Sequence, residues 1–200
     1  MKSIEWFGHS AIKIVTDNDK ILYFDPYNIN INDQADYIFI THSHFDHFSV
    51  PDILKIARPT TKILVSFDYK FADLIITKLF KPYDDFEDEF IKVKTIPAYN
   101  HGKRFHPKSN NWVGYIVSFD NITVYHSGDT DIIPEMRETV NVDIAFLPIG
   151  GTYTMDFKEA ARAVNEIIKP KKIMAIHYDS DDAFNKFSEL IDPHQLLRMV

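Results

Sequence analysis

The sequence predicts one domain, residues 1–200, with an α/β (α+β) fold. Short apolar segments typical of β-strands alternate with segments of helical periodicity over most of the chain. The 200 residues are 45% hydrophobic, which is enough for one sizeable core. No stretch rich in glycine, serine and proline divides the sequence into two parts. These observations favour a single folded unit over two domains or a disordered chain.

The strand-like segments are short runs of apolar and β-branched residues bounded by turn-forming residues. Tyr37–Ile40 (YIFI) is apolar throughout, as expected for a strand that is buried on both faces. The acidic segment Asp84–Glu89 is interpreted as a solvated turn. We expect strands at Ser3–Phe7, Ala11–Val15, Ile21–Phe24, Tyr37–Ile40, Ile63–Ser66, Ile91–Ile96, Val113–Phe119, Ile122–Tyr125, Val142–Leu147 and Lys172–Ile176.

Four segments have the apolar spacing of helices. Val50–Ala57 carries a proline at its second position, where the first turn of a helix tolerates it. Asp156–Ile168 begins with a residue suited to capping a helix and ends before Pro170. The other two predicted helices are Tyr69–Leu79 and Asp182–Ile191.

The composition excludes several classes of protein. The chain contains no cysteine, which excludes disulfides, thiolate zinc sites, iron–sulfur clusters and cysteine nucleophiles. Its net charge of −7 argues against a nucleic-acid binder, because such proteins usually carry a basic surface. The first residues lack the apolar stretch of a signal peptide, and no apolar run approaches the roughly 18 residues of a membrane helix. We therefore expect a cytoplasmic protein.

Three histidines and an aspartate lie within residues 41–47 (THSHFDH), directly after the predicted strand Tyr37–Ile40. Imidazole nitrogen and carboxylate oxygen together suit a borderline divalent cation, and four such side chains can be shared between two ions. A histidine-rich surface turn is the alternative, but the buried strand that precedes the segment favours a metal site. The candidate ligands here are His42, His44, Asp46 and His47.

Other histidines and an aspartate follow three more of the predicted strands. In layered α/β folds, side chains at the downstream ends of strands meet at one edge of the sheet. The pattern therefore predicts one composite site rather than several unrelated histidines. These further candidates are Asp129, His177, His101 and His106.

The sequence resembles the metallo-β-lactamase superfamily from Ile4 to His177. Residues 42–47 (HSHFDH) match its H-x-H-x-D-H motif, residues 128–130 match its G-D-T element, and His177 matches its last ligand. Residues 6–10 (WFGHS) and 24–26 (FDP) resemble a compact branch of metal-dependent hydrolases that includes ascorbate-6-phosphate-lactonase-like proteins. The resemblance implies a four-layer αββα sandwich with the metal ions at one edge between two sheets.

The resemblance also implies how two divalent ions would be held. A bridging water made acidic by both ions would be the nucleophile, and Asp46 would be the catalytic residue that orients it or takes its proton. Zinc is the preferred metal, and manganese and iron also suit ligands without a thiolate. The first ion would take His42, His44 and a third histidine; the second would take Asp46, His47 and His177; Asp129 would bridge them.

The third histidine of the first site is displaced from its usual place. Many relatives carry an A-x-H element, whereas this chain has Ala98–Asn100 (AYN). His101 is the next residue, and His106 lies further along the same loop. We prefer His106 as the ligand, because the longer loop can fold back to the metal.

Three residues are candidates for positions beside the ligands: Asp25, His9 and His101. A carboxylate at the end of a strand can accept a hydrogen bond from the free ring nitrogen of a metal-bound histidine. Basic side chains near residue 106 have two interpretations, as partners for a phosphate or carboxylate of the substrate or as a solvated loop. They are Lys103, Arg104 and Lys108.

The sequence thus predicts a metal-dependent hydrolase that directs a metal-bound hydroxide at an ester, lactone or phosphodiester of a small molecule. The alternatives are a nuclease or phosphodiesterase acting on nucleic acid and a non-catalytic metal-binding protein. A di-iron oxidoreductase is disfavoured, because such relatives usually carry glutamate at the position of His44 and add a flavin domain. We expect a small-molecule substrate and no nucleic-acid or membrane partner; a homo-oligomer is compatible with the sequence.

Overall fold

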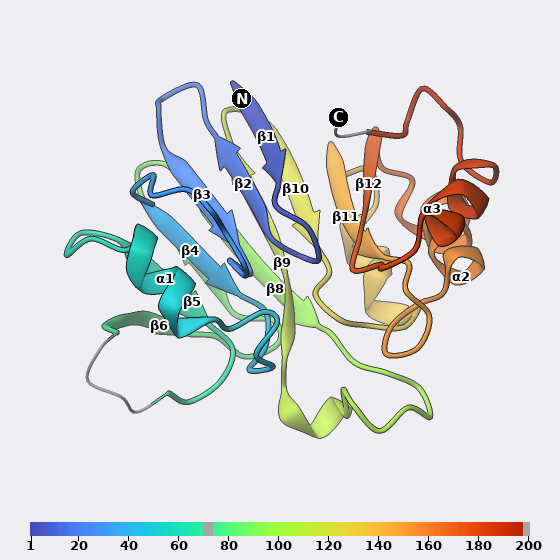
Figure 1. Ribbon diagram of the computed structural model, residues 1–200, viewed down its shortest axis with the longest axis horizontal. Coiled ribbons are helices and arrows are strands. Elements are labelled where there is room, and N and C mark those ends of the chain that lie inside the picture. The colour runs from blue at the N-terminus through green and yellow to red at the C-terminus, as the bar shows by residue number, and fades with distance from the viewer. Residues whose placement is uncertain (70–73, 198–200) are drawn as a thin grey trace.

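Two six-stranded β-sheets packed face to face form the centre of the protein (Figure 1). The computed structural model describes residues 1–69 and 74–197. The first sheet contains, in spatial order, β1 (Ser3–Trp6), β2 (Ile12–Val15), β3 (Ile21–Phe24), β4 (Tyr37–Ile40), β5 (Lys62–Val65) and β6 (Ile76–Leu79). The second contains β12 (Lys172–Ile176), β11 (Ile144–Pro148), β10 (Ile122–His126), β9 (Val113–Phe119), β8 (Lys92–Pro97) and β7 (Asp85–Glu87).

Helices cover the outer face of each sheet. Figure 1 shows α1 beside β4 and β5 on one side of the molecule, and α2 and α3 beyond β11 and β12 on the other. This arrangement confirms the four-layer αββα sandwich that the resemblance implied. None of the helices in the described part of the chain has the length and apolarity needed to cross a bilayer. The helical elements are α1 (Val50–Ile56), η1 (Lys108–Asn110), η2 (Pro134–Thr139), α2 (Phe157–Arg162), its π-helical continuation η3 (Ala163–Ile168) and α3 (Asp181–Ser188).

Aromatic side chains fill the space between the two sheets. Phe24 of β3 stacks on Phe39 of β4 with 4.7 Å between ring centroids, and it lies 6.5 Å from Phe146 of β11 in the other sheet. All three side chains are fully buried. Burial of such large apolar groups supplies most of the favourable free energy of folding, so this layer holds the sheets together.

The direction of the strands determines where the functional residues collect. The neighbouring strands β3, β4 and β5 run parallel, as do β10, β11 and β12. Parallel neighbours end at the same edge of a sheet, and the loops that follow β3, β4, β10 and β12 carry the predicted site. The sandwich therefore brings sequence segments more than a hundred residues apart to one edge.

Local sequence signals explain the helix boundaries. The Ser49 side chain caps α1, and Pro51 occupies its first turn as predicted. Asp156 caps α2, and the Glu159 carboxylate accepts a hydrogen bond from the backbone N–H of Asp156, so the two form a capping box. The predicted helix Asp182–Ile191 corresponds to α3. The expected strands are present with ends shifted by at most two residues.

Two predictions were wrong at one edge of the sandwich. Part of the predicted helix Tyr69–Leu79, residues 70–73, lies outside the described residues, and Ile76–Leu79 forms strand β6. Pairing with β5 outweighs the helical spacing, and two β-branched residues at its start favour an extended chain. The acidic segment Asp84–Glu89 is not only a turn, because Asp85–Glu87 forms β7 against β8. Phe86 packs on the core while the acidic neighbours face solvent.

We predict that the Tyr115 hydroxyl contributes to the packing of the sheets. It donates to the carbonyl oxygens of Ile40 at 3.0 Å and Leu64 at 3.2 Å, which belong to the opposite sheet. Tyr115→Phe should therefore lower the free energy of unfolding by about 1–2 kcal/mol in urea titrations.

Tyr125→Phe is the matched control, because Tyr125 is equally buried and its hydroxyl has no hydrogen-bond partner. Removal of an unsatisfied hydroxyl should leave stability unchanged or raise it slightly. Equal effects of the two substitutions would contradict a bridging role for Tyr115.

Candidate metal centre

The structure brings all seven predicted ligands to one edge of the sandwich. They come from the ends of β4, β10 and β12 and from the loop between β8 and β9. Their donor atoms form overlapping groups in which every pair of atoms lies within 4.8 Å. Those groups are His42 with His44 and His106, His42 with His47 and Asp129, and His9 with Asp46, His47 and His177.

Asp129 lies at the centre of the cluster. One of its carboxylate oxygens is 3.2 Å from Nε2 of His47. The other is 3.2 Å from Nε2 of His106 and 3.0 Å from Nε2 of His177. Asp129 thus contacts histidines of both predicted sites, which is the position that a bridging ligand requires.

The central atoms approach one another without forming hydrogen bonds. Within the described residues, Nε2 of His47, His106 and His177 and Oδ1 of Asp129 are buried and have no hydrogen-bond partner. Unsatisfied buried polar atoms are costly and uncommon in native proteins. Four of them facing one space, with imidazole and carboxylate chemistry, fit a divalent cation held between them.

Asn100 orients His106 in the first group. Oδ1 of Asn100 accepts a hydrogen bond from Nδ1 of His106 at 2.9 Å, and its amide donates to Asp131 at 3.1 Å. The backbone N–H of Asn100 also donates to the carbonyl of His106 at 2.8 Å. These contacts leave Nε2 of His106 as the nitrogen that faces the cluster. Asparagine at the A-x-H position therefore supports the displaced histidine instead of replacing it.

Asp25 plays the same part for His47. It is fully buried at the end of β3, and its Oδ2 accepts from Nδ1 of His47 at 2.7 Å. It also accepts from the backbone N–H and the hydroxyl of Thr41, at 2.8 and 2.7 Å. The same hydroxyl lies 3.0 Å from Nδ1 of His42. Asp25 and Thr41 thus direct the Nε2 atoms of two histidines toward the cluster, and Asp25 makes the contact predicted for it.

His9 contacts the second group. Its Nε2 lies 3.0 Å from Oδ2 of Asp46, and its ring packs on that of His177 with 3.9 Å between centroids. The backbone N–H of His177 donates to the carbonyl of His9 at 2.9 Å. His9, Asp25 and His177 have positive φ angles of 48°, 43° and 50°, a conformation that costs side-chain-bearing residues free energy. Such strain concentrates at functional sites.

Two glycines allow the loops to approach closely. A Cβ atom on Gly128, which has φ +60°, would lie 2.8 Å from Cβ of Thr41. A Cβ atom on Gly150 would lie 2.5 Å from the carbonyl oxygen of His177. Only glycine fits at either place without displacement of the backbone that holds the cluster.

The charges of the cluster are strongly coupled. Burial by itself would lower the pKa of His47, but the carboxylates of Asp129 and Asp25 outweigh burial and hold that pKa well above its usual value. Burial by itself would raise the pKa of Asp129, but the charges of His47 and His177 hold it well below its usual value. Without a metal, a protonated His47 therefore balances the buried carboxylate.

Asp46 is ionised for a related reason. Burial would raise the pKa of its carboxyl group, but the hydrogen bond from His9 and the charge of His47 lower that pKa to about 2. Burial lowers the pKa of His42 and His44, and the nearby cationic histidines lower it further. Neutral imidazoles and ionised carboxylates are the forms that bind metal ions.

Comparison with known proteins identifies the family of the chain. A family model described as the beta-lactamase superfamily domain matches residues 3–177. The chain belongs to this superfamily. A UPF0173 metal-dependent hydrolase of Thermococcus onnurineus (strain NA1) is 33% identical over an alignment of 200 positions. The alignment covers 90% of this chain and 86% of that protein. Membership of this superfamily and of its metal-dependent hydrolases was predicted from the motifs and is confirmed.

Solved structures agree with this assignment. The crystal structure of a protein from Parabacteroides distasonis ATCC 8503, described as a metal-dependent hydrolase, matches with a TM-score of 0.83 and 29% identity. The match covers 96% of this chain and 89% of that one. The metallo-β-lactamase fold protein YhfI from Bacillus subtilis has a TM-score of 0.71 at 13% identity, and the match covers 94% and 88% of the two chains. The second likeness shows the fold alone.

Some predicted residues lie outside the cluster of this superfamily member. The His101 side chain is exposed and packs on Tyr99, while its backbone N–H donates to Asp131. Lys103 pairs with Asp131 and Lys108 with Glu135, so neither ammonium group is directed at the cluster. Sequence analysis missed three residues that orient or pack against the histidines: Asn100, Thr41 and Trp112. Their proximity in sequence to His106 and His42 was the only signal.

A pocket of about 310 Å³ opens onto the cluster. Its lining contains five of the predicted ligands together with Phe45, Phe105 and Tyr153. Its size suits a small-molecule substrate. The five ligands are His44, Asp46, His106, Asp129 and His177.

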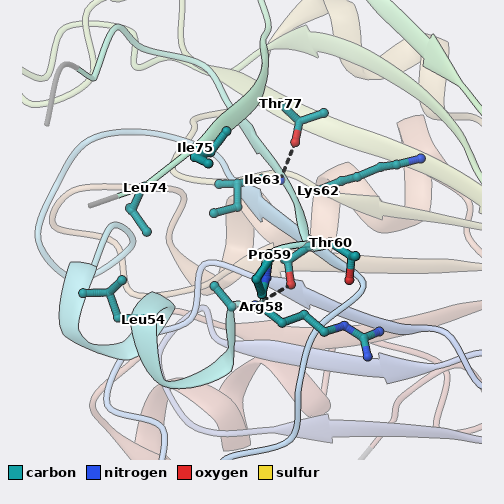
Figure 2. A pocket seen from close by; sticks show the side chains of 11 residues that line it. Leu54, Arg58, Pro59, Thr60, Lys62, Ile63, Leu74, Ile75 and Thr77 are labelled. Carbon is teal, nitrogen blue, oxygen red and sulfur yellow. Dashed lines mark hydrogen bonds between the residues drawn. The ribbon is translucent and has the colours of Figure 1, made fainter. Parts of the chain in front are cut away.

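Another cavity of about 350 Å³ lies between the end of α1 and the strands β5 and β6 (Figure 2). Figure 2 shows Leu54, Leu74 and Ile75 around it, and a hydrogen bond from the backbone N–H of Ile63 to the Thr77 hydroxyl. Its described lining contains neither histidine nor a carboxylate. It therefore lacks the donor set of a metal centre, and the candidate active site is the pocket above the cluster.

We predict that His106, and not His101, completes the first group. His106→Ala removes a buried nitrogen that faces the cluster, so the metal content per chain should fall in elemental analysis. His101→Ala is the matched control and should leave metal content nearly unchanged, because that side chain points to solvent. Asn100→Ala should weaken metal affinity by about 10- to 100-fold, the usual scale for a residue that orients a ligand. The reverse order for the two histidine variants would assign the ligand to His101.

Proposed function

We propose that this superfamily member is a hydrolase that holds two divalent metal ions and cleaves an ester, lactone or phosphodiester of a small molecule. Zinc is the preferred metal, and manganese and iron also suit the mixed imidazole and carboxylate donors. In this proposal His42, His44 and His106 would hold one ion, Asp46, His47 and His177 would hold the other, and Asp129 would serve both. The single observation that carries the proposal is the central position of Asp129 among His47, His106 and His177, whose Nε2 atoms have no hydrogen-bond partner within the described residues.

The side chains around the cluster have separate roles in this reaction. Bound divalent ions supply an acidic water as nucleophile and polarise the scissile bond. Asp46 lines the pocket as an ionised carboxylate, so it can orient a water or accept its proton. His9 holds the Asp46 carboxylate through the 3.0 Å contact, and Asp25 fixes the ring of His47. These contacts keep the acceptor and the ligand rings in place before substrate binds.

Metal removal tests the proposal directly. Protein purified without chelator should contain up to two transition-metal ions per chain. It should hydrolyse at least one member of a panel of esters, lactones and phosphodiesters. Chelation should abolish turnover, and zinc, manganese or iron should restore it. Absence of any transition metal, even after reconstitution, would contradict the hydrolase proposal. Bound metal without turnover on a broad panel would favour a non-catalytic metal-binding protein.

The Asp46→Asn variant tests the catalytic role. The substitution keeps the size of the side chain but removes the negative charge, so turnover should fall by about 10²-fold or more at saturating metal. Metal affinity at the second group should also weaken. Folding should be spared, because Asp46 lies in the loop after β4 and is partly exposed.

Asp52→Asn is a suitable control for this measurement. Asp52 accepts hydrogen bonds from Ser49 and the backbone of Asn28 and pairs with Lys55 at the start of α1, outside the pocket lining. Its loss should lower the melting temperature and leave turnover nearly unchanged. Wild-type turnover in Asp46→Asn would remove this residue from the mechanism.

A further inference from the structure

Three exposed aromatic side chains surround the mouth of the metal pocket. We call Phe45, Phe105 and Tyr153 the aromatic rim. Their exposed fractions are 75%, 47% and 46%, and all three line the pocket. Large apolar groups gathered around one opening are unfavourable in water, and such groups commonly mark a ligand-binding surface.

The aromatic rim is held in place by its own contacts. Phe105 and Tyr153 pack edge to face with 4.6 Å between ring centroids, although they come from different loops. Phe45 packs edge to face on Tyr27 with 6.1 Å between centroids. Rings restrained in this way lose little conformational entropy when a ligand binds.

The aromatic rim is adjacent to candidate metal ligands in the sequence. Phe45 stands between His44 and Asp46 in the sequence, and Phe105 immediately precedes His106. A substrate group that contacts these rings therefore occupies the same pocket of about 310 Å³ as a substrate atom at the cluster. The rim is placed to hold the part of the substrate beside the scissile bond.

The described lining of the pocket contains no lysine or arginine. Two of the three basic side chains in the loop after β8 are engaged elsewhere, because Lys103 pairs with Asp131 and the carbonyl of Thr154, and Lys108 pairs with Glu135. The third, Arg104, is exposed and is not part of the pocket lining. Phosphoryl groups are usually recognised by arginine or lysine. The pocket thus offers apolar surface and no side-chain cation for a charged substrate.

We infer that the substrate is an uncharged ester or lactone that carries an apolar acyl or aromatic group, which the aromatic rim binds beside the cleaved bond. This inference rests on the proposed hydrolytic function and narrows its substrate class. In the reaction, water adds to the carbonyl carbon, the bond from that carbon to the ester oxygen breaks, and a proton passes to the departing oxygen. The products are a carboxylic acid and an alcohol, or one hydroxy acid from a lactone.

Binding of alkyl hydroxamates to the zinc-reconstituted full chain tests the inference without turnover. Octanohydroxamate should bind about 50-fold more tightly than acetohydroxamate in calorimetric titrations. The two compounds differ by about six methylene groups, so this ratio corresponds to slightly less than a twofold gain in affinity for each. Such a gain is about half of the free energy that full burial of a methylene group gives. In Phe105→Ala and Phe45→Ala the ratio should fall below about tenfold, while the affinity for acetohydroxamate and the metal content stay near wild type.

Phe90→Ala is the matched control, because Phe90 is also partly exposed but lies under the ammonium group of Lys20, away from the pocket. It should keep the wild-type ratio. A ratio near one in the wild type, or a ratio that the rim substitutions leave unchanged, would overturn the inference while the metal centre stands.

Turnover gives a second, independent check. The zinc-loaded chain should cleave p-nitrophenyl octanoate with a higher kcat/KM than p-nitrophenyl acetate, and both faster than bis(p-nitrophenyl) phosphate. Faster cleavage of the phosphodiester would overturn the substrate class and leave the hydrolase proposal intact. Failure of the chain to retain metal would overturn the proposed function itself, and the inference with it.

Discussion

The buried carboxylate of Asp129 is the constraint on which the rest of the site depends. A carboxylate removed from water is unfavourable unless cationic or hydrogen-bonding groups surround it. Here the surrounding groups are imidazoles that three separate parts of the chain deliver, from the ends of β4 and β12 and from the loop after β8. Without a metal the protonated His47 balances the charge, and a bound dication would take the place of that proton. Positive charge at this edge of the two sheets therefore stabilises the buried carboxylate.

That constraint explains the local departures from ordinary backbone geometry. His9 and His177 adopt positive φ angles although neither is glycine, and Gly128 and Gly150 bring loops closer than a Cβ atom would permit. Each departure costs free energy that the aromatic layer between the sheets must offset. The molecule therefore combines a regular, strongly apolar centre with one strained edge, a combination expected where function and stability compete.

The spatial grouping of the candidate ligands was easier to predict from the sequence than the elements at the periphery, for physical reasons. Four of the candidate ligands lie within residues 42–47 after a buried strand, and strand order then brings Asp129 and His177 to the same edge. The contact between Asp25 and His47 could also be anticipated, because Asp25 ends the neighbouring parallel strand. By contrast, Asn100 makes its contact through a folded-back loop, which has no periodicity to analyse. Strand β6 forms by pairing with β5, so tertiary contact overrode its helical spacing.

The strand ends and the loops contribute different parts of the site, and this difference affects substrate specificity. Most of the ligands are fixed where strands end, and buried partners such as Asp25 and Thr41 restrain their rings. The aromatic rim stands on loops, two of which also carry ligands, and its rings pack on other rings, Phe105 on Tyr153 and Phe45 on Tyr27. A substitution in the rim can alter the group that is held without removing a metal-binding atom, because phenylalanine side chains supply none. The chemistry of the site is thus set by the sandwich, and the choice of substrate by loops that the sandwich only supports.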